Sequence, residues 1–393
     1  MASDGPASDA PTEPDDRDRL RVLWLTKGLD LGGQERLLAL LAKKHDRATV
    51  AIECAFTADR LRFLVGSLEA AGVTCRSLSP SGRKWSWIVQ LWGLLGENRF
   101  DVVHAHSPLV ASVARVMVAL KRRQSKPVMM TTSHLVWSGY HPLTRGANRI
   151  TAWLDDVSIA VSPAVLRSMR GRARRRGQVM VQGVDIAELR TRFVAPVDDR
   201  ANQTDRRREV VVCTVANLSP QKDYPMLLSA AKIVAATQPD VRFVAVGYDV
   251  DAYAADMRDL RDRLGLARQF DFVGLNDDAV AVMAASDVYV VSSRFEAGPV
   301  AAMEAAVIGV PIVTTDVGIM SDAFSDGVDC LRVPVGDAPA LAGALLRLIG
   351  DRELQNRLRE NGRQLANDRF DIARVIVDLQ NLYRNQVALR AVG

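Results

Sequence analysis

The sequence of 393 residues lacks most of the features that mark secreted, membrane-spanning or metal-binding chains. Its four cysteines are scattered and form neither a CxxC pair nor any other metal-ligand spacing: Cys54, Cys75, Cys213 and Cys330. No uninterrupted apolar run approaches the ~20 residues of a membrane-spanning helix. The N-terminus has no charged start followed by an apolar core, so no signal peptide is expected. These absences predict a cytoplasmic protein of a reducing compartment.

A GxGxxG fingerprint for dinucleotide binding is also missing, which disfavours an NAD-dependent oxidoreductase. After the first apolar run, RVLWLT (21–26), the chain continues as KGLDLGGQER and holds the adjacent glycines Gly32 and Gly33. Two glycines permit a tight turn and a close approach of the backbone to a phosphate at the following helix start. A plain turn between strand and helix explains the pair equally well, so both interpretations stay open.

Charge is distributed unevenly along the chain. Residues 1–18 carry a net charge of −5 among Pro, Ser and Ala, which predicts a disordered acidic tail. Residues 19–200 carry a net charge of +15, and residues 201–393 carry −5. The N-terminal half therefore predicts an anionic partner, such as an acidic surface, an acceptor or a lipid headgroup layer. No aromatic interleaving or recognised module supports nucleic-acid binding.

Apolar runs alternate with segments of helical period through two successive stretches of the chain. The runs expected to form strands are RVLWLT (21–26), TVAIECAF (49–56), FDVVHAH (100–106), PVMMTTS (127–133), VSIAVS (157–162), VVVCTVAN (210–217), VRFVAVG (241–247), QFDFVG (269–274), DVYVVSS (287–293) and PIVTT (311–315). Alternation at this spacing predicts an α/β fold with two doubly wound parallel sheets and a cleft between them.

The pattern is interrupted by the polar segment 195–208, which predicts a linker. We therefore expect an N-terminal Rossmann-like domain at 19–195 and a C-terminal one at 209–369. The remaining segment, 370–393, reads as a long amphipathic helix that is followed by no strand. Its apolar face needs a surface, so we expect this helix to cross back and pack on the first domain.

Two carboxylates bracket a predicted helix start in SSRFEAGPVAAMEAAVIGVP (292–311). Glu296 follows a buried strand, and Glu304 lies in the second turn of a helix that begins at Gly298-Pro299, since Pro loses no needed N–H at the first helical position. Helix starts at the carboxyl edge of a parallel sheet bind anionic ligands. The pair therefore predicts a ligand with both phosphate and hydroxyl groups, such as a nucleotide sugar.

Histidines and a lysine are also expected at the carboxyl edges of the sheets. His104 and His106 end one predicted strand and His134 follows the next, where a side chain faces the crevice. We favour His134 as functional and keep His106 as an additional candidate, because His104 and His106 share a face and either fits a structural role. Lys222, in ANLSPQKDY (216–224), could neutralise a diphosphate or be an ordinary surface lysine.

Two stretches of the N-terminal half bear on an acceptor or a surface. SGRKWSWIVQLWGLLG (81–96) joins basic residues to three tryptophans on a helix that is apolar nearly all round, so burial and contact of Trp85 with a membrane surface both stay open. MRGRARRRG (169–177) carries five arginines: Arg170, Arg172, Arg174, Arg175 and Arg176. A solvated helix end and contact with anionic lipid or a phosphate-bearing acceptor both fit this run.

In their order along the chain, these motifs resemble glycosyltransferase family 4, the glycosyl transferases group 1. The motifs that carry the resemblance are GGQERLLALLA, DVVHAHSPLVAS, TTSH, AVSPAV, VQGVD, ANLSPQKDYPMLL, the E-x7-E stretch SSRFEAGPVAAMEAAVIGVPIVTTDVG, and DGVDCLRVPVGDAPALAGAL. The resemblance implies a GT-B fold, in which two Rossmann-like domains face each other. It also implies a retaining hexosyltransferase that needs neither a metal nor another cofactor.

Roles for individual residues follow from the resemblance. His134 and Glu296 would act at the donor sugar as catalytic residues, and Glu304 would accept hydrogen bonds from the ribose hydroxyls. The groups that would bind the diphosphate are Gly32, Gly33, Lys222, Arg294, Gly298 and Pro299.

The chain departs from the family pattern in the loop that carries Lys222. Members usually have an arginine at the position of Asn217 or of Ser219, and neither residue is Arg here. We expect Arg294 or Lys27 to supply the missing cation. The usual Asn before Gly-Val-Asp is also replaced, by Gln182.

The expected activity is transfer of a hexosyl unit from a UDP- or GDP-linked sugar to a cell-envelope, polysaccharide or lipid-linked acceptor. The enzyme would be cytoplasmic and peripheral on the inner face of the membrane, with its arginine run and Trp85 facing an anionic surface. One alternative is a nucleotide-sugar 2-epimerase of the same fold, which the E-x7-E stretch argues against. Another is a non-catalytic nucleotide-sugar binder, which the missing arginine keeps open.

Overall fold

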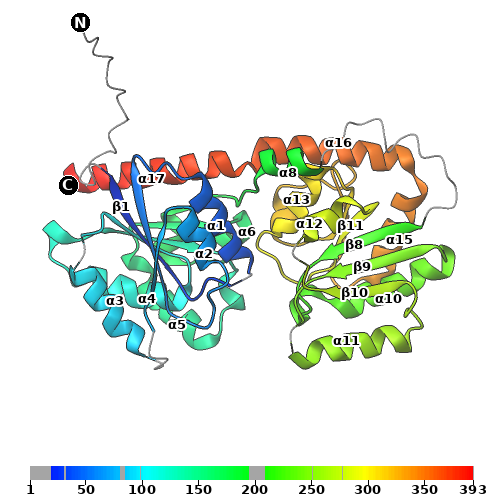
Figure 1. Cartoon of the computed structure of the whole chain (residues 1–393), viewed down its shortest axis with the longest axis horizontal. Coiled ribbons are helices and arrows are strands. Elements are labelled where there is room, and N and C mark those ends of the chain that lie inside the picture. Colours follow the sequence, from blue (N-terminus) through cyan, green and yellow to red (C-terminus); the bar gives the residue numbers. More distant parts are fainter. Residues whose placement is uncertain are drawn as a thin grey trace, which may run out of the picture. The chain divides into compact units, whose positions relative to one another are not determined.

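The computed structural model describes residues 19–30, 32–79, 85–97, 99–193, 209–249, 251–276 and 278–392. The predicted acidic tail (1–18), the predicted linker (195–208), Arg83 and Lys84 lie outside the described residues. By its internal contacts the chain divides into two compact units. One unit consists of Met1–Thr131 with Val377–Gly393, and the other of Thr132–Ile376. Figure 1 shows the described elements, coloured along the chain.

Seven strands form the N-terminal sheet, in the spatial order β3-β2-β1-β4-β5-β6-β7. Their bounds are Leu20–Thr26 (β1), Val50–Phe56 (β2), Thr74–Ser77 (β3), Val102–Ala105 (β4), Val128–Ser133 (β5), Val157–Ala160 (β6) and Gly177–Val179 (β7). The pairings described in this sheet are parallel. The order reverses between β1 and β4, so the loops after those two strands flank the switch point of the sheet.

Helices connect these strands, as parallel crossovers require, and α8 follows the last of them. The helices are Gly33–Lys44 (α1), Val65–Ala70 (α2), Ser86–Glu97 (α3), Pro108–Ala119 (α4), Pro142–Thr151 (α5), Pro163–Ser168 (α6), Gly171–Arg175 (α7) and Ile186–Phe193 (α8), with 3-10 turns at Arg123–Ser125, Trp137–Gly139 and Ala152–Leu154. Proline is the first residue of α4, α5 and α6, where its missing N–H costs no hydrogen bond.

Six strands form the C-terminal sheet, in the order β10-β9-β8-β11-β12-β13. They are Val210–Val215 (β8), Val241–Val246 (β9), Phe270–Gly274 (β10), Val288–Val291 (β11), Ile312–Thr315 (β12) and Leu331–Val333 (β13). The helices are Tyr224–Thr237 (α10), Asp251–Arg263 (α11), Ala279–Ala284 (α12), Val300–Ile308 (α13), Gly318–Asp322 (α14), Ala338–Gly350 (α15) and Arg352–Arg369 (α16), and a 3-10 turn spans Pro220–Lys222. The strand order of this sheet reverses between β8 and β11.

Strand β11 shows why these strands are apolar along their whole length. Val288 and Val290 belong to one buried cluster, and Tyr289 and Val291 belong to another. Alternate side chains point to opposite faces of a sheet, so the strand separates two cores. Helices cover both faces of such a sheet, which explains a continuous apolar run where a half-exposed strand would alternate.

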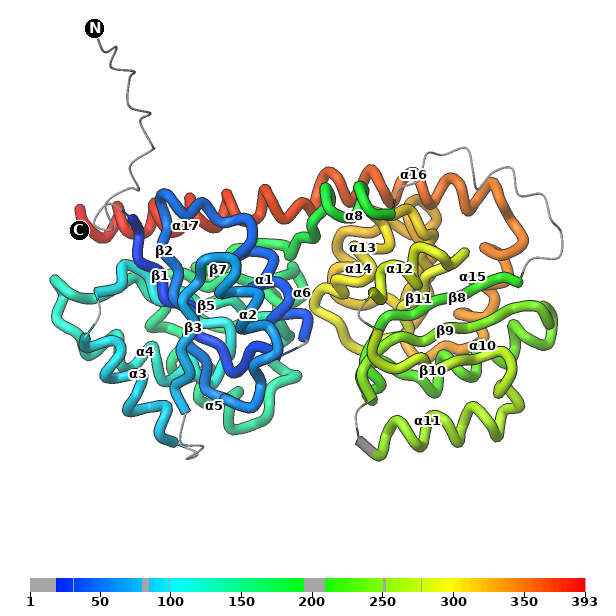
Figure 2. Tube along the Cα trace, viewed as in Figure 1, coloured from blue at the N-terminus to red at the C-terminus, as the bar shows by residue number. Residues whose placement is uncertain are grey.

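The last helix, α17 (Ile372–Val392), contributes a buried tyrosine to the first unit. The Trp24 indole Nε1 donates to the Tyr383 hydroxyl at 3.1 Å, and that hydroxyl lies 2.6 Å from His104 Nδ1. Arg384 donates to Thr49 Oγ1 at 2.6 Å. These bonds attach the end of the chain to β1 and β4, and Figure 2 lets the reader follow the red trace of α17 beside blue β1.

The two faces of α3 have different environments. Trp87 and Leu94 pack into the core of the N-terminal sheet, whereas Trp92 is exposed, as is Trp85 just before the helix. Burial therefore explains only one of the apolar faces of this helix. Leu95 is also buried. Contact of the exposed face with a membrane stays a prediction.

Candidate functional site

The two loops that flank the switch point of the C-terminal sheet meet through an ion pair. Lys222 ends the 3-10 turn after β8, and Glu296 lies in the loop after β11. The Lys222 ammonium contacts Glu296 Oε1, and Ser293 Oγ donates to the same oxygen at 2.8 Å. Both charged side chains are largely buried, so solvent screens the pair weakly. A lysine and a carboxylate thus lie together at the carboxyl edge of the sheet.

Hydrogen bonds to the backbone hold these two loops in register. Ser292 Oγ donates to the carbonyl of Lys222 at 2.7 Å, and Gln221 Nε2 donates to the carbonyl of Phe295 at 2.8 Å. The backbone N–H of Arg294 donates to the carbonyl of Gln221 at 2.8 Å. Because three hydrogen bonds join the two loops, the backbone at Lys222 is held in position relative to the Glu296 loop.

Asp223 follows the lysine and has the only positive φ among the described non-glycine residues, at 49°. Aspartate tolerates this left-handed conformation better than most residues. Its buried carboxylate accepts two hydrogen bonds from Arg294, at 2.8 Å from Nε and 3.2 Å from a terminal nitrogen. The positive charge of Arg294 is therefore balanced by Asp223, and the predicted contact of Arg294 with a diphosphate stays a prediction.

Helix α13 begins just after the Glu296 loop. Pro299 precedes its first turn with a φ of −70°, and a Cβ added to Gly298 would meet its neighbours at ordinary distances of 3.5 Å and more. Glu304 is half-buried on this helix. Burial is the main reason that the pKa of Tyr289 lies well above its usual value, and the charges of Glu304 and Glu296 add to the rise. Both carboxylates therefore lie close to one buried tyrosine of β11.

Gly318, the first residue of α14, lets the Glu296 loop approach closely. Its φ is 50°, and a Cβ there would lie 2.4 Å from the carbonyl oxygen of Glu296 and 2.7 Å from that of Ala297. The N–H of Ile319 donates to the Ala297 carbonyl at 3.1 Å. Glycine is needed here both for its positive φ and for the close approach.

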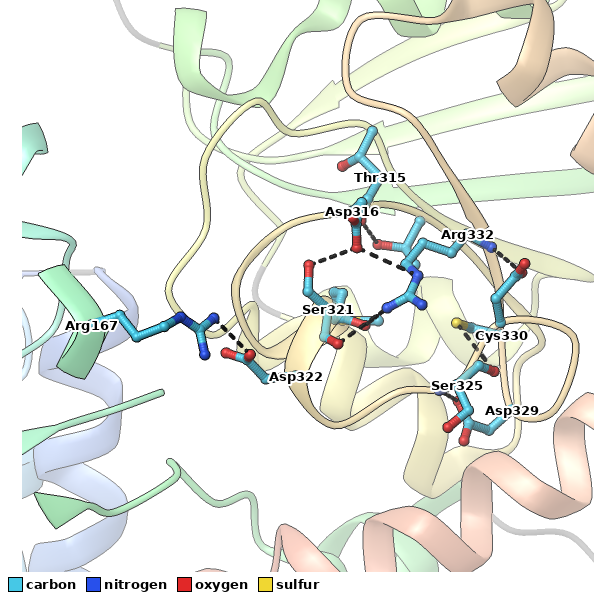
Figure 3. Close-up of polar contacts among 12 residues, drawn as sticks. Arg167, Thr315, Asp316, Ser321, Asp322, Ser325, Asp329, Cys330 and Arg332 are labelled. Atoms are coloured by element: carbon cyan, nitrogen blue, oxygen red, sulfur yellow. Dashed lines mark hydrogen bonds and ion pairs between the residues drawn. The ribbon is translucent and has the colours of Figure 1, made fainter. Parts of the chain in front are cut away.

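An arginine fixes the position of α14 from its other side. Asp316 accepts a hydrogen bond from Ser321 Oγ at 2.7 Å, and it pairs with Arg332 Nε at 3.4 Å. Arg332 also donates to the carbonyls of Met320 and Ser321 (Figure 3). Helix α14, which contacts the Glu296 loop, is therefore itself held by several polar contacts.

His134 lies just after β5, with its Nδ1 3.0 Å from Nε2 of Gln182. An amide nitrogen only donates, so Nδ1 accepts and the neutral ring carries its proton on Nε2. Burial lowers the pKa of His134 to about 3, which keeps the ring neutral at physiological pH. The Gln182 oxygen lies 3.7 Å from where a Cβ of Gly298 would be. The same amide thus bonds to the histidine and lies near the loop before α13.

Gly32 and Gly33 form the start of α1 in the first unit. A Cβ on Gly32 would lie 2.1 Å from Oε2 of Glu35, so this carboxylate folds over the helix start. Burial raises the pKa of Glu35. An anion could bind at these glycines only after the carboxylate moves or takes up a proton. The predicted diphosphate contact of the two glycines stays a prediction.

His106 is packed among aromatic rings at the end of β4. Its ring centroid lies 4.2 Å from that of His104 and 5.9 Å from that of Trp24, and its backbone N–H donates to Leu25 at 2.8 Å. This packing gives both histidines a structural role in the core of the first unit. A role of His106 at a ligand stays a prediction.

Three contributors to this region were not predicted. Ser293 donates a hydrogen bond to the carboxylate of Glu296, and Asp223 neutralises the charge of Arg294. Gln182 donates to the ring of His134 and orients it. Gln182 had a sequence signal, because it replaces the family's usual Asn. Ser293 and Asp223 gave no signal beyond their places in the two loops.

Two kinds of feature are absent from the part of the chain that the structure describes. No group of three His, Cys, Asp or Glu side chains in it could hold a metal ion. None of its helices is both long and apolar enough to cross a bilayer.

Two family models match the chain and together cover most of it. The model described as Glycosyltransferase Family 4 matches residues 31–188. The model described as Glycosyl transferases group 1 matches residues 198–365, which contain all six strands of the C-terminal sheet.

Individual relatives carry compatible names. The putative glycosyltransferase EpsD of Bacillus subtilis is 24% identical over 307 residues, which are 75% of this chain and 79% of that protein. The UDP-Gal:alpha-D-GlcNAc-diphosphoundecaprenol alpha-1,3-galactosyltransferase of Escherichia coli is 22% identical over 336 residues, 80% of this chain and 82% of that protein.

A solved structure has the same architecture. The Anabaena protein HepE, solved in complex with UDP and glucose, superposes with a TM-score of 0.78 over 93% of this chain and 99% of its own, at 21% sequence identity. Two parallel α/β sheets and this likeness together give the GT-B fold. The chain is a glycosyltransferase and belongs to the group 1 glycosyltransferases.

Proposed function

We propose that this enzyme is a retaining, metal-independent glycosyltransferase that moves a hexosyl unit from a UDP- or GDP-linked sugar to a glycan or lipid-linked acceptor of the cell envelope. The observation that carries the proposal is the pairing of Lys222 with Glu296 at the switch point of the C-terminal sheet, beside the start of α13. Ligands of open α/β folds bind at this point.

In the proposed donor complex, the nucleotide lies along α13. Glu304 accepts hydrogen bonds from the ribose, because a carboxylate offers two acceptor oxygens to a vicinal diol. The diphosphate lies between Lys222 and the first turn of α13, after Gly298 and Pro299, where helix N–H groups have no partner within the helix. Arg294 adds positive charge beside this position, partly balanced by Asp223.

Donor binding also separates the ion pair. The diphosphate competes with Glu296 for the Lys222 ammonium, and the carboxylate that is released turns toward the donor sugar. When the bond between the anomeric carbon and the diphosphate oxygen breaks, negative charge grows on the departing group. Lys222 and the helix start stabilise that charge, so the proposed reaction uses no metal.

His134 completes the sugar end of the site. Its Nδ1 is held by Gln182, so its Nε2–H donates to the donor sugar. A neutral imidazole suits this task, since it adds no charge that would attract the diphosphate away from Lys222. We propose that His134 and Glu296 are the catalytic residues.

The proposed acceptor and location rest on charge and on the names of relatives. The E. coli relative is named for an acceptor that carries a diphosphoundecaprenol group. Residues 19–200 of this chain carry a net charge of +15, and two tryptophans are exposed, Trp85 just before α3 and Trp92 on that helix. We place the enzyme at the cytoplasmic face of a membrane, with acceptor binding in the domain of residues 19–195 and donor binding in that of 209–369.

The test is a panel of nucleoside diphosphate sugars. The pure protein is incubated with each sugar in the presence of a chelator, and the melting temperature and the released nucleotide are measured. We expect one donor to raise the melting temperature and to be hydrolysed slowly. Once an acceptor is found, NMR of the product gives the anomeric configuration, and an inverted product would rule out the retaining mechanism.

The alternatives give different results in the same assay. Interconversion of the sugar without nucleotide release would identify a 2-epimerase. A melting-temperature shift without any turnover, with acceptor mixtures present, would identify a non-catalytic binder. Restoration of activity only when a divalent cation replaces the chelator would contradict metal independence.

A further inference from the structure

A cavity of about 650 Å³ in the second unit is lined by five arginines. Arg145 and Arg149 come from α5, and Arg167 comes from α6. Arg170 immediately precedes α7, and Arg174 is the last but one residue of that helix. Nothing in the proposed donor site uses these side chains, so the cavity is a separate feature of the enzyme.

Local structure explains why the arginines converge. Arg145 and Arg149 are four residues apart on α5 and therefore lie on one face of that helix. Gly171 has a φ of 59° and meets no atom within 4 Å of an added Cβ, so it is a turn residue and not a packing residue. The positive φ of Gly171, the first residue of α7, changes the direction of the chain between Arg170 and Arg174, and both side chains line the same space.

The positive charge of this cavity is only partly compensated. Arg167 pairs with Asp322 at 3.0 Å, as Figure 3 shows, and Arg145 donates to the Ser138 carbonyl at 3.4 Å. Within the described ranges, the structure gives no ion pair for Arg149 or Arg170. The same is true of Arg174. Several unpaired guanidinium groups facing one cavity favour a multivalent anion, since guanidinium binds phosphate oxygens in a bidentate manner.

Apolar side chains in the cavity lining, and others near its arginines along the chain, indicate the rest of the ligand. Trp137 and Met169, both buried, contribute to its lining. Next to the arginines of α5 along the chain, Leu143 is 79% exposed, Ile150 is 72% exposed and Trp153 is 57% exposed. Exposed apolar side chains that adjoin basic ones are typical of surfaces that meet a lipid layer.

We propose that this cavity binds the diphosphate or phosphate group of a lipid-linked acceptor, while Leu143, Ile150 and Trp153 contact its lipid. The inference rests on the proposed function, because it names the chemical class of the acceptor. The cavity would hold the anionic group of that acceptor.

The first experiment measures binding of inorganic pyrophosphate by calorimetry at low salt. Arg170→Gln with Arg174→Gln is compared with Arg175→Gln with Arg176→Gln. Both double variants lose two positive charges from the arginine run at 169–177, but Arg175 and Arg176 do not line the cavity. We expect the first variant to bind pyrophosphate about tenfold more weakly or worse and the second to bind like the wild type. Equal binding by both would overturn the proposal.

The second experiment distinguishes a lipid-linked ligand from a free phosphate. Phosphatidylcholine vesicles with and without a polyprenyl diphosphate are sedimented with the full chain. We expect sedimentation only with the polyprenyl diphosphate, and loss of it in Leu143→Ser with Ile150→Ser, a variant that still binds pyrophosphate. Binding of pyrophosphate without any vesicle binding would overturn the lipid-linked part and identify a site for a soluble phosphate.

The two proposals fail in different ways. Donor turnover is measured on the wild-type protein alone. Pyrophosphate binding that depends on the cavity, without hydrolysis of any donor, would refute the proposed function and leave an anion site. Donor hydrolysis together with cavity-independent pyrophosphate binding would refute the cavity and leave the transferase.

Discussion

The Lys222 ammonium and the Glu296 carboxylate neutralise each other at the switch point of the C-terminal sheet, and Ser293 donates to the same carboxylate oxygen at 2.8 Å. Each charge is therefore already satisfied by the other. A diphosphate that enters must replace the carboxylate as the partner of the lysine. The ion pair thus opposes the binding of the nucleotide while it holds both side chains in place.

Glu296→Gln tests this competition. The amide keeps the size of the side chain but removes its charge, so Lys222 becomes available to a diphosphate. We expect UDP to bind about tenfold more tightly, the effect of one charge-assisted hydrogen bond, and kcat with the donor to fall. Calorimetry with UDP and a nucleotide-release assay measure the two effects. Weaker binding of UDP would show that Glu296 supports the nucleotide instead of competing with it.

Glu304→Ala should weaken the binding of the nucleotide by about 1–3 kcal/mol, because the ribose hydroxyls would lose a charged acceptor. The control is Glu353→Ala, which removes an exposed carboxylate at the start of α16. Calorimetry with UDP and with a nucleotide whose sugar lacks the 2′-hydroxyl separates the ribose contact from other effects. Unchanged affinity in Glu304→Ala would remove the assignment.

His134 should make the fold sensitive to acid. Its pKa is about 3 in the folded chain and near 6.5 when unfolded, so between these values the unfolded state binds more protons. Stability therefore falls as the pH drops from 6.5 toward 3, on the order of 1 kcal/mol per pH unit. In His134→Gln this contribution disappears, and urea unfolding at a series of pH values should give a flatter profile. Equal slopes in both proteins would place the pKa of His134 near its usual value.

Gly318→Ala should destabilise the enzyme by about 1–3 kcal/mol, because the new Cβ would overlap the carbonyl of Glu296 and the positive φ strains alanine. Displacement of the Glu296 loop should also lower donor affinity. Gly327→Ala is the control, since Gly327 has a φ of 73° but open space around its Cβ. If both variants lose equal stability and neither loses donor affinity, backbone conformation alone explains the effect.

Tyr383→Phe should cost about 1–3 kcal/mol of stability, because the Trp24 indole N–H would lose its acceptor in a buried position. The hydroxyl also contacts His104 Nδ1. Trp24→Phe tests the coupling: in a double-mutant cycle the two substitutions should be non-additive by thermal unfolding. Simple additivity would mean that the hydrogen bond contributes nothing of its own.

All ten strands that the apolar runs predicted are present, because buried parallel strands need continuous apolar sequences. The three strands that were missed, β3, β7 and β13, have three or four residues each. Their sequences, TCRS, GQV and LRV, are too short to carry a period. Each of them forms a strand by pairing with a longer neighbouring strand: β3 with β2, β7 with β6 and β13 with β12.

The site could be predicted as far as its loops. Placement at the carboxyl ends of two neighbouring strands brought Lys222 and Glu296 together, and this depends only on topology. Pairings across loops depend on side-chain geometry, which explains why Asp223 was not assigned to Arg294. The arginine cavity was missed for a similar reason. Arg145 and Arg149 lie outside the arginine run at 169–177, and only the fold brings them to it.

The hydrogen bond between Trp24 and Tyr383 also bears on how the protein is made. Its two partners are 359 residues apart in the chain. At usual rates of synthesis, roughly tens of seconds separate the emergence of the first strand from that of its last partner. Until then the buried indole of β1 and the His104 ring lack the hydroxyl that satisfies them. This hydrogen bond can form only after residue 383 has emerged, so a nascent chain stalled before that residue would hold an incomplete first core.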